Sequence, residues 1–280
     1  MTMIIPTRFS SAINQHVVLS LVELESQPVI MGIFGKPGEG KTHQLRAALQ
    51  RIGVQALSIN AADLESDRAG TPGKTVLAGY LNASRAIEKS MPTCIVIDDV
   101  DTTVGEWENN TGTVNHQQVL AQLMHLADSP NQIEQVGRVK RAPIFLTGND
   151  FGKIYGPLRR PGRILPFHWQ PTPEERGEVV LEIFNDLLSP RQVTDLLTRY
   201  PEQPVAFFSD VRSRIISSGT APLIQQLAKE LTMVCQNPGL FKERLLQSAV
   251  KYVTRDGAQK IANDLAQSHN KMLQSYLQLE

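Results

Sequence analysis

The hydrophobic positions of the chain form two different patterns, which divide it near residue 170. Before that point, short apolar runs alternate with helical periodicity, at 29–34, 56–59, 93–97, 144–147 and 164–169. Strands that are buried on both faces and alternate with helices are typical of a parallel sheet covered on both sides. The pattern therefore predicts an α/β unit with a five-stranded parallel sheet flanked by helices.

After residue 170 the strand pattern stops and only helical periodicity remains. Thr172 and Glu175 have the spacing of a capping box, with Pro173 at the first helical position. Pro and Gly residues predict interruptions of the helical pattern at 189–190, 201, 219 and 238–239. We expect a short helical lead-in over residues 1–28, the α/β subdomain over 29–170, and a helical lid subdomain with a tail helix over 171–280.

A glycine-rich loop joins the first predicted strand to a helix-like segment. It reads Gly35, Lys36, Pro37, Gly38, Glu39, Gly40, Lys41 and Thr42. Such a loop curls so that its N–H groups face phosphate oxygens at the positive end of a helix. Lys41 is expected to reach the β- and γ-phosphates and Thr42 to hold Mg²⁺. A chance match in a glycine-rich turn is the alternative, but the strand, loop and helix stand in the order of a P-loop, which predicts binding of a nucleoside triphosphate.

Two other predicted strands end in polar residues. Asp98 and Asp99 follow the strand at 93–97, and Asn149 follows the strand at 144–147. We expect Asp98 to hold Mg²⁺ and Asp99 to polarise the attacking water. Asn149 is expected to orient that water beside the γ-phosphate. The alternative for Asp98 and Asp99 is a solvated turn after the strand, and the alternative for Asn149 is a simple turn former. Asp101 is the second candidate for the base.

Clustered arginines follow in the segment Leu158–Arg163, on a Pro-Gly loop. Arginines on such a loop can enter a neighbouring subunit's site and neutralise charge on the transferred phosphoryl group, the arginine-finger role. A solvated basic loop is the alternative.

Together these motifs resemble the AAA+ ATPase superfamily and, at finer grain, the Rubisco activases of plants and cyanobacteria. The segments that carry the resemblance are 32–41, 62–66 with 69–70, 113–115, 123–128, 147–151, 162–163, and Phe207-Phe208 followed by Arg212 and Arg214. The resemblance implies an AAA+ P-loop NTPase module followed by a helical lid. It implies Arg160 and Arg163 as arginine fingers and Arg212 as the sensor-2 arginine, with Arg214 as the alternative.

The resemblance also implies a function. It implies an ATP hydrolase that uses ATP and Mg²⁺ in a homo-oligomeric, hexameric ring. The implied client is Rubisco, from which the ring would release tight-binding sugar phosphates, in the cyanobacterial cytosol with carboxysome association left open. Residues 64–70 and 105–112 resemble pore loops, and Trp107 in the second is either a gripping residue or a structural one. Asp99 departs from the Glu that is usual in AAA+ proteins, which implies slow hydrolysis.

Composition narrows the alternatives. The chain has 280 residues, with 28 Lys and Arg against 28 Asp and Glu, so it lacks the global basic excess of a nucleic-acid-binding protein. Cys94 and Cys235 are too few for a disulfide framework. No apolar run is long enough to span a membrane and no signal peptide is evident, so we expect a soluble cytosolic protein. An AAA+ machine acting on nucleic acid and a nucleotide-binding scaffold for carboxylase or carboxysome components remain as alternatives.

Overall fold

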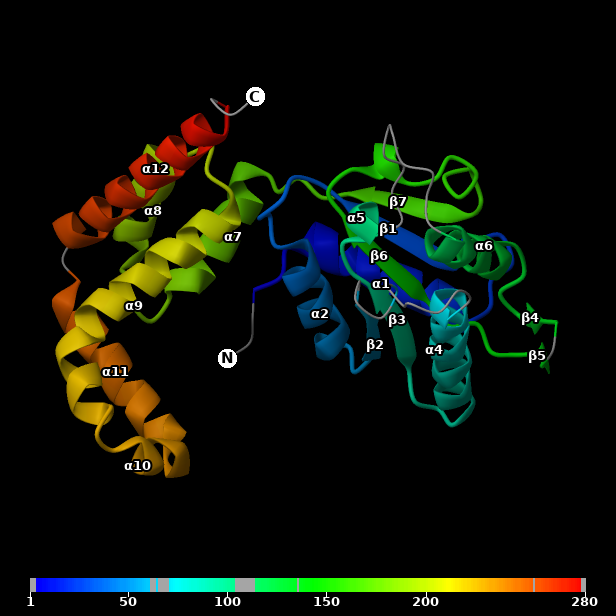
Figure 1. Ribbon diagram of the computed structural model, residues 1–280, viewed down its shortest axis with the longest axis horizontal. Helices are drawn as coiled ribbons and strands as arrows, with labels where there is room; N and C mark the ends of the chain where they lie inside the picture. The colour runs from blue at the N-terminus through cyan, green and yellow to red at the C-terminus, as the bar shows by residue number, and fades with distance from the viewer. Residues whose placement is uncertain are drawn as a thin grey trace. The chain divides into compact units, whose positions relative to one another are not determined.

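The computed structural model describes residues 4–60, 64, 71–103, 114–134, 136–253 and 255–277. The chain forms two compact units, one over Ile5–Gln170 and one built mainly from the residues after Gln170. Figure 1 shows strands in the first unit and helices alone in the second. Each unit is described by itself below.

The first unit contains a five-stranded parallel sheet, which confirms the predicted fold. Its strands are β1 (Ile30–Phe34), β2 (Gln55–Ile59), β3 (Thr93–Ile97), β6 (Ile144–Gly148) and β7 (Ile164–His168). Their order in the sheet is β2-β3-β6-β1-β7. In the register, Phe34 of β1 lies opposite Gly148 of β6, and Ile97 of β3 lies opposite Leu146. The carboxyl ends of these three central strands therefore meet at one edge, where α/β sheets bind ligands.

Helices cover both faces of the sheet (Figure 1). Helices α4 (Thr71–Glu88) and α6 (Val114–Asp128) contribute Tyr80 and Leu123 to the core that includes Ile30 and Ile97. On the other face lie α1 (Thr7–Leu21) and α2 (Lys41–Arg51), and His16 of α1 packs edge-to-face on Phe145 of β6. The short elements are α5 (Val100–Thr103), the antiparallel pair β4 (Gln132–Ile133) and β5 (Gly137–Arg138), and the 3₁₀ helix η1 (Phe151–Lys153). The β4–β5 pair was not predicted.

The second unit consists of helices joined by short connections, with no strand among its described residues. It contains α7 (Pro173–Phe184), α8 (Pro190–Arg199), α9 (Val205–Leu227), α10 (Leu231–Gln236), α11 (Pro238–Tyr252) and α12 (Arg255–Leu277). The capping box predicted at Thr172 is confirmed, since Glu175 N–H donates to the Thr172 side chain and the Glu175 carboxylate accepts from Thr172 N–H. Phe184, Phe207 and Phe208 are buried in its core.

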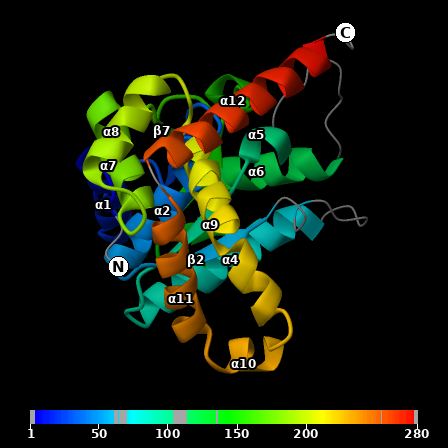
Figure 2. The same ribbon diagram turned by 90° about the vertical axis from the view of Figure 1, so that its left-hand side faces the viewer.

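The predicted break at Gly219 is wrong, because α9 continues through this residue. A Cβ atom at Gly219 would lie 2.8 Å from the Cα of Ala249 in α11. The glycine therefore lets two helices approach closely instead of ending one, and Ser248 donates a hydrogen bond of 2.8 Å to its carbonyl. Figure 2 shows α9 running beside α11.

Candidate active site

The glycine-rich loop lies between β1 and α2, as the sequence predicted for a P-loop. Gly38 and Gly40 have φ angles of 77° and 74°, in the left-handed region that favours glycine. At Gly35 a Cβ atom would lie 2.0 Å from the Trp169 carbonyl oxygen. These three positions leave the backbone close-packed and free of side chains, which fits a phosphate cradle.

Trp169, which directly follows β7, fastens the loop to the sheet. Its backbone N–H donates to the Phe34 carbonyl at 2.6 Å, and its indole Nε1–H donates to the Glu39 carbonyl at 2.8 Å. The side chain is 1% exposed and packs edge-to-face on Phe9 of α1, with ring centroids 4.8 Å apart. Sequence reasoning placed Trp169 at the end of a strand and missed this contact, because no local pattern links residues 130 positions apart.

Lys41 connects the P-loop to the predicted sensor residue. Its Nζ donates to the carbonyls of Gly35 at 2.8 Å and Lys36 at 3.0 Å, and to Asn149 Oδ1 at 2.9 Å. The side chain is 8% exposed, and desolvation lowers the pKa of its ammonium group. The nearby carboxylates, Asp101 first, oppose that lowering. A cation on the loop and an amide at the end of β6 thus meet where the γ-phosphate is expected.

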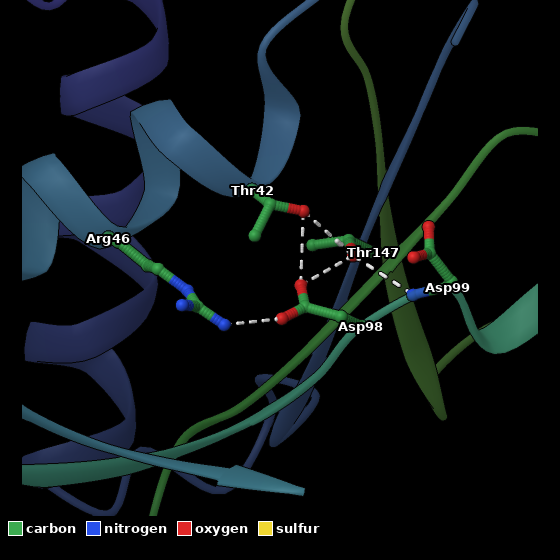
Figure 3. Close-up of polar contacts among 5 residues, drawn as sticks. All are labelled: Thr42, Arg46, Asp98, Asp99 and Thr147. Atoms are coloured by element: carbon green, nitrogen blue, oxygen red, sulfur yellow. Dashed lines mark hydrogen bonds and ion pairs between the residues drawn. The ribbon is translucent and has the colours of Figure 1, made fainter. Parts of the chain in front are cut away.

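The two predicted Mg²⁺ ligands also meet (Figure 3). Thr42 Oγ1 donates to Asp98 Oδ1 at 3.1 Å, and Thr147 Oγ1 donates to the same oxygen at 2.8 Å. Arg46 Nη2 donates to Asp98 Oδ2 at 2.8 Å. A hydroxyl and a carboxylate fit Mg²⁺, which keeps several waters and takes one or two protein ligands. Neither Thr147 nor Arg46 was predicted.

Asp99, the predicted base, follows Asp98 but points elsewhere. It is exposed, it has a φ angle of 52°, and Figure 3 shows its carboxylate turned away from that of Asp98. The left-handed conformation is uncommon outside glycine, although Asp tolerates it better than most residues. Adjacent carboxylates can therefore serve a metal and a water separately.

Asp101 supports the segment that carries Asn149, the predicted sensor, instead of facing outward. Its side chain is buried, and Oδ2 accepts hydrogen bonds from the N–H groups of Asn149 at 2.9 Å and Asp150 at 3.3 Å. Among the described residues its Oδ1 has no hydrogen-bond partner. The sequence did not predict this supporting role, since the run Asp98-Asp99-Val100-Asp101 does not indicate which carboxylate turns inward.

The two predicted arginine fingers differ in their surroundings. Arg160 is exposed, and its side chain makes no hydrogen bond with any residue that the structure describes. Arg163 donates from Nε and Nη2 to the two oxygens of Asp128 at 2.8 and 2.6 Å, and from Nη1 to the Pro157 carbonyl at 2.9 Å. All three of its guanidinium nitrogens are therefore bonded within its own chain.

Arg212, the predicted sensor-2 residue, lies on α9 of the helical unit. Its guanidinium bonds both carboxylate oxygens of Asp186 and donates to the Ile183 carbonyl at 2.7 Å. This hydrogen bonding lowers the pKa of Asp186. Arg214, the alternative, is exposed and pairs with none of the described residues. Arg212 thus braces the helical unit, while Arg214 is available to a ligand.

Other predictions concern residues outside the site. The segments expected to form pore loops, 64–70 and 105–112, lie outside the described residues except for Leu64, and so does Trp107. Cys94 is buried, which raises the pKa of its thiol to about 12, and Cys235 is exposed; both are free. Within the described ranges, no helix has the length and apolarity to cross a membrane, and no group of three or more His, Cys, Asp or Glu residues could hold a metal.

A P-loop whose lysine donates to Asn149, and whose threonine donates to Asp98 just beyond β3, is typical of P-loop nucleoside triphosphatases. The chain belongs to the AAA family: the model of the "ATPase family associated with various cellular activities (AAA)" matches residues 31–170. The predicted class, a member of the AAA family of ATPases, is confirmed.

Curated relatives confirm the finer resemblance. The chain is 36% identical over 240 residues to a Rubisco activase of Anabaena, covering 82% of this chain and 58% of the relative. It is 36% identical over 216 residues to the chloroplastic activase of Chlamydomonas reinhardtii, covering 74% and 53%. For the chloroplastic activase of Arabidopsis thaliana the identity is 35% over 210 residues, covering 72% and 44%. The chain spans about half the length of these relatives.

Proposed function

We propose that this chain is the motor of a Rubisco-remodelling machine, which uses ATP hydrolysis to release tight-binding sugar phosphates from the carboxylase active site. The observation that carries the proposal is the identity with Rubisco activases over most of the chain. The assembled P-loop, Asp98 and Asn149 support it, because remodelling needs a working hydrolysis site. A cyanobacterial cytosol is the setting that we propose, by analogy with the Anabaena relative.

The chemistry follows from the side chains of the site. Thr42 and Asp98 would hold Mg²⁺, which supplies charge neutralisation for the phosphates. Lys41 would exchange the carbonyls of Gly35 and Lys36 for phosphate oxygens, and Asn149 would orient water. Asp99 would accept the proton of the water whose oxygen attacks the γ-phosphorus, while the bond to the β,γ-bridging oxygen breaks.

Arg160 is our candidate for the arginine finger of a ring. Its exposed guanidinium has no partner among the described residues, so it can reach a second copy of the chain without breaking an ion pair. Arg163 and Asp128 would instead hold the loop that presents Arg160. By the same reasoning Arg214 is a better sensor-2 candidate than Arg212, which would first have to leave Asp186. We propose a homo-oligomeric ring of six copies.

The proposal is tested by recovery of carboxylation. Rubisco locked with a sugar-phosphate inhibitor is mixed with the protein, ATP and Mg²⁺, and CO₂ fixation is followed with time. We expect ATP-dependent recovery that Lys41→Ala abolishes. ATP hydrolysis without recovery would contradict Rubisco as the client, and stimulation by DNA would then favour a nucleic-acid machine. Negligible hydrolysis with tight ATP binding would favour a scaffold.

A further inference from the structure

Thr147 occupies the central position at the ligand-binding edge of the sheet. It lies in β6, between β1 and β3, opposite Ile33 and one residue beyond the pairing of Leu146 with Ile97. Its side chain is 1% exposed. A buried hydroxyl on an apolar strand costs free energy unless it is hydrogen-bonded, so its partners indicate what it is for.

The Thr147 hydroxyl touches both acidic residues that follow β3. It donates to Asp98 Oδ1 at 2.8 Å and accepts from the Asp99 N–H at 3.3 Å. Its oxygen also lies 3.4 Å from Thr42 Oγ1 (Figure 3). One hydroxyl therefore contacts the two expected Mg²⁺ ligands and the backbone of the expected base.

We infer that Thr147 is a positioning residue, which sets the orientation of the Asp98 carboxylate toward Mg²⁺ and the left-handed turn at Asp99. Thr42 alone cannot do this, because its hydroxyl shares Asp98 Oδ1 and is itself expected to ligate the metal. Thr147 is not an expected metal ligand, so its hydroxyl stays available to that oxygen when Thr42 turns toward a metal. The inference rests on the proposed magnesium–nucleotide site.

The position of Thr147 also links this turn to the sensor. Thr147 precedes Asn149 by two residues in the same segment, and Asn149 Oδ1 accepts from Lys41. The end of β6 therefore carries both the hydroxyl that contacts the acidic turn and the amide that contacts the P-loop lysine.

Thr147→Val tests the inference, because Val keeps the shape of Thr and removes the hydroxyl. ATP turnover is measured against free Mg²⁺ concentration for the wild type, Thr147→Val and Thr147→Ser. Loss of a hydrogen bond to a charged acceptor predicts a fall in turnover of ~10- to 100-fold in Thr147→Val. We expect half-maximal activity to need ~10-fold more Mg²⁺ in this variant, by the same reasoning. Thr147→Ser should stay near the wild type.

Thr93→Val is the matched control. Thr93 is as buried as Thr147 and begins β3, whose other end leads to Asp98, but its hydroxyl donates only to the Met91 carbonyl at 2.9 Å. Thr93→Val should leave the Mg²⁺ dependence of ATP turnover unchanged. Binding of a fluorescent ATP analogue in EDTA should be the same in all variants, since no metal is involved. An Mg²⁺ dependence that is equal in Thr147→Val and Thr147→Ser, or shifted equally by Thr93→Val, would overturn the inference.

A second measurement separates this inference from the proposed function. If the wild type fails to hydrolyse ATP, the proposed function fails, and Mg²⁺-dependent strengthening of analogue binding still reports on Thr147. Adding Thr147→Val to Asp98→Ala should then cause no further shift, because the acceptor of the Thr147 hydroxyl is already absent. A full additional shift would contradict the role. If Thr147→Val does not fold, Thr147→Ala is measured against Thr147→Ser in the same way.

Discussion

Removal of the Arg160 guanidinium and removal of the Arg163 guanidinium should affect ATP turnover to different extents. If Arg160 enters the site of the next protomer, Arg160→Ala removes a contact to transition-state charge, and ATP turnover should fall by ~10³-fold or more. Arg163→Ala should remove only the support that its ion pair with Asp128 and its hydrogen bond to the Pro157 carbonyl give to the loop. The two substitutions therefore distinguish a finger from the residue that holds its loop.

The size of that support follows from the exposure of the ion pair. The side chains of Arg163 and Asp128 are 23% and 49% exposed, so solvent screens their attraction. A partly exposed pair of this kind contributes ~1 kcal/mol, which corresponds to a loss of about fivefold in ATP turnover. Asp128→Ala should cause a modest loss of this size, and Arg163→Ala a slightly larger one, because it also removes the bond to the Pro157 carbonyl. The double variant should lose no more than Arg163→Ala, since that substitution already removes the ion pair.

Steady-state ATPase rates of the four variants give these ratios directly. Mixing then tests for action between subunits: Arg160→Ala protomers keep a working P-loop, and Lys41→Ala protomers keep their arginines, so mixed assemblies should regain hydrolysis. Subunit exchange is verified with fluorescent labels. A ~10³-fold loss in Arg163→Ala, with Asp128→Ala near the wild type, would refute the reasoning, because Arg163 would then act outside its own ion pair.

Three other predictions follow from the site and the core. Lys41→Ala should lower ATP turnover by at least ~100-fold, because a preorganised charge at the phosphates is lost; near-native turnover would contradict the P-loop assignment. Asp99→Asn should bind the ATP analogue but not hydrolyse ATP, and normal hydrolysis would place the base elsewhere. Burial lowers the pKa of His16 from 6.5 to about 4, so the unfolded state binds the proton more tightly. The free energy of unfolding, measured with urea, should therefore fall by up to ~3 kcal/mol as the pH falls from 6.5 to 4. His16→Gln should weaken that dependence.

The sheet and the P-loop were predictable because their signals are local. A buried strand is a run of apolar residues, and the glycines that permit the left-handed turns stand in the loop itself. The partners of Asp98 were not predictable, since Thr147 is a strand residue and Arg46 an ordinary surface residue of α2 until the fold brings them together. Likewise the sequence gives Arg160 and Arg163 the same chemistry, and only the position of Asp128 separates them.

The burial of Trp169 has a practical consequence for spectroscopy. The chain has two tryptophans, Trp107 and Trp169, so a Trp107→Phe variant emits from one indole. That indole donates its N–H to the Glu39 carbonyl and packs on Phe9, and its emission depends on the polarity around it. The protein therefore carries an intrinsic fluorophore hydrogen-bonded to its phosphate loop, and we expect nucleotide loading to change its emission, which can be followed in real time without a dye.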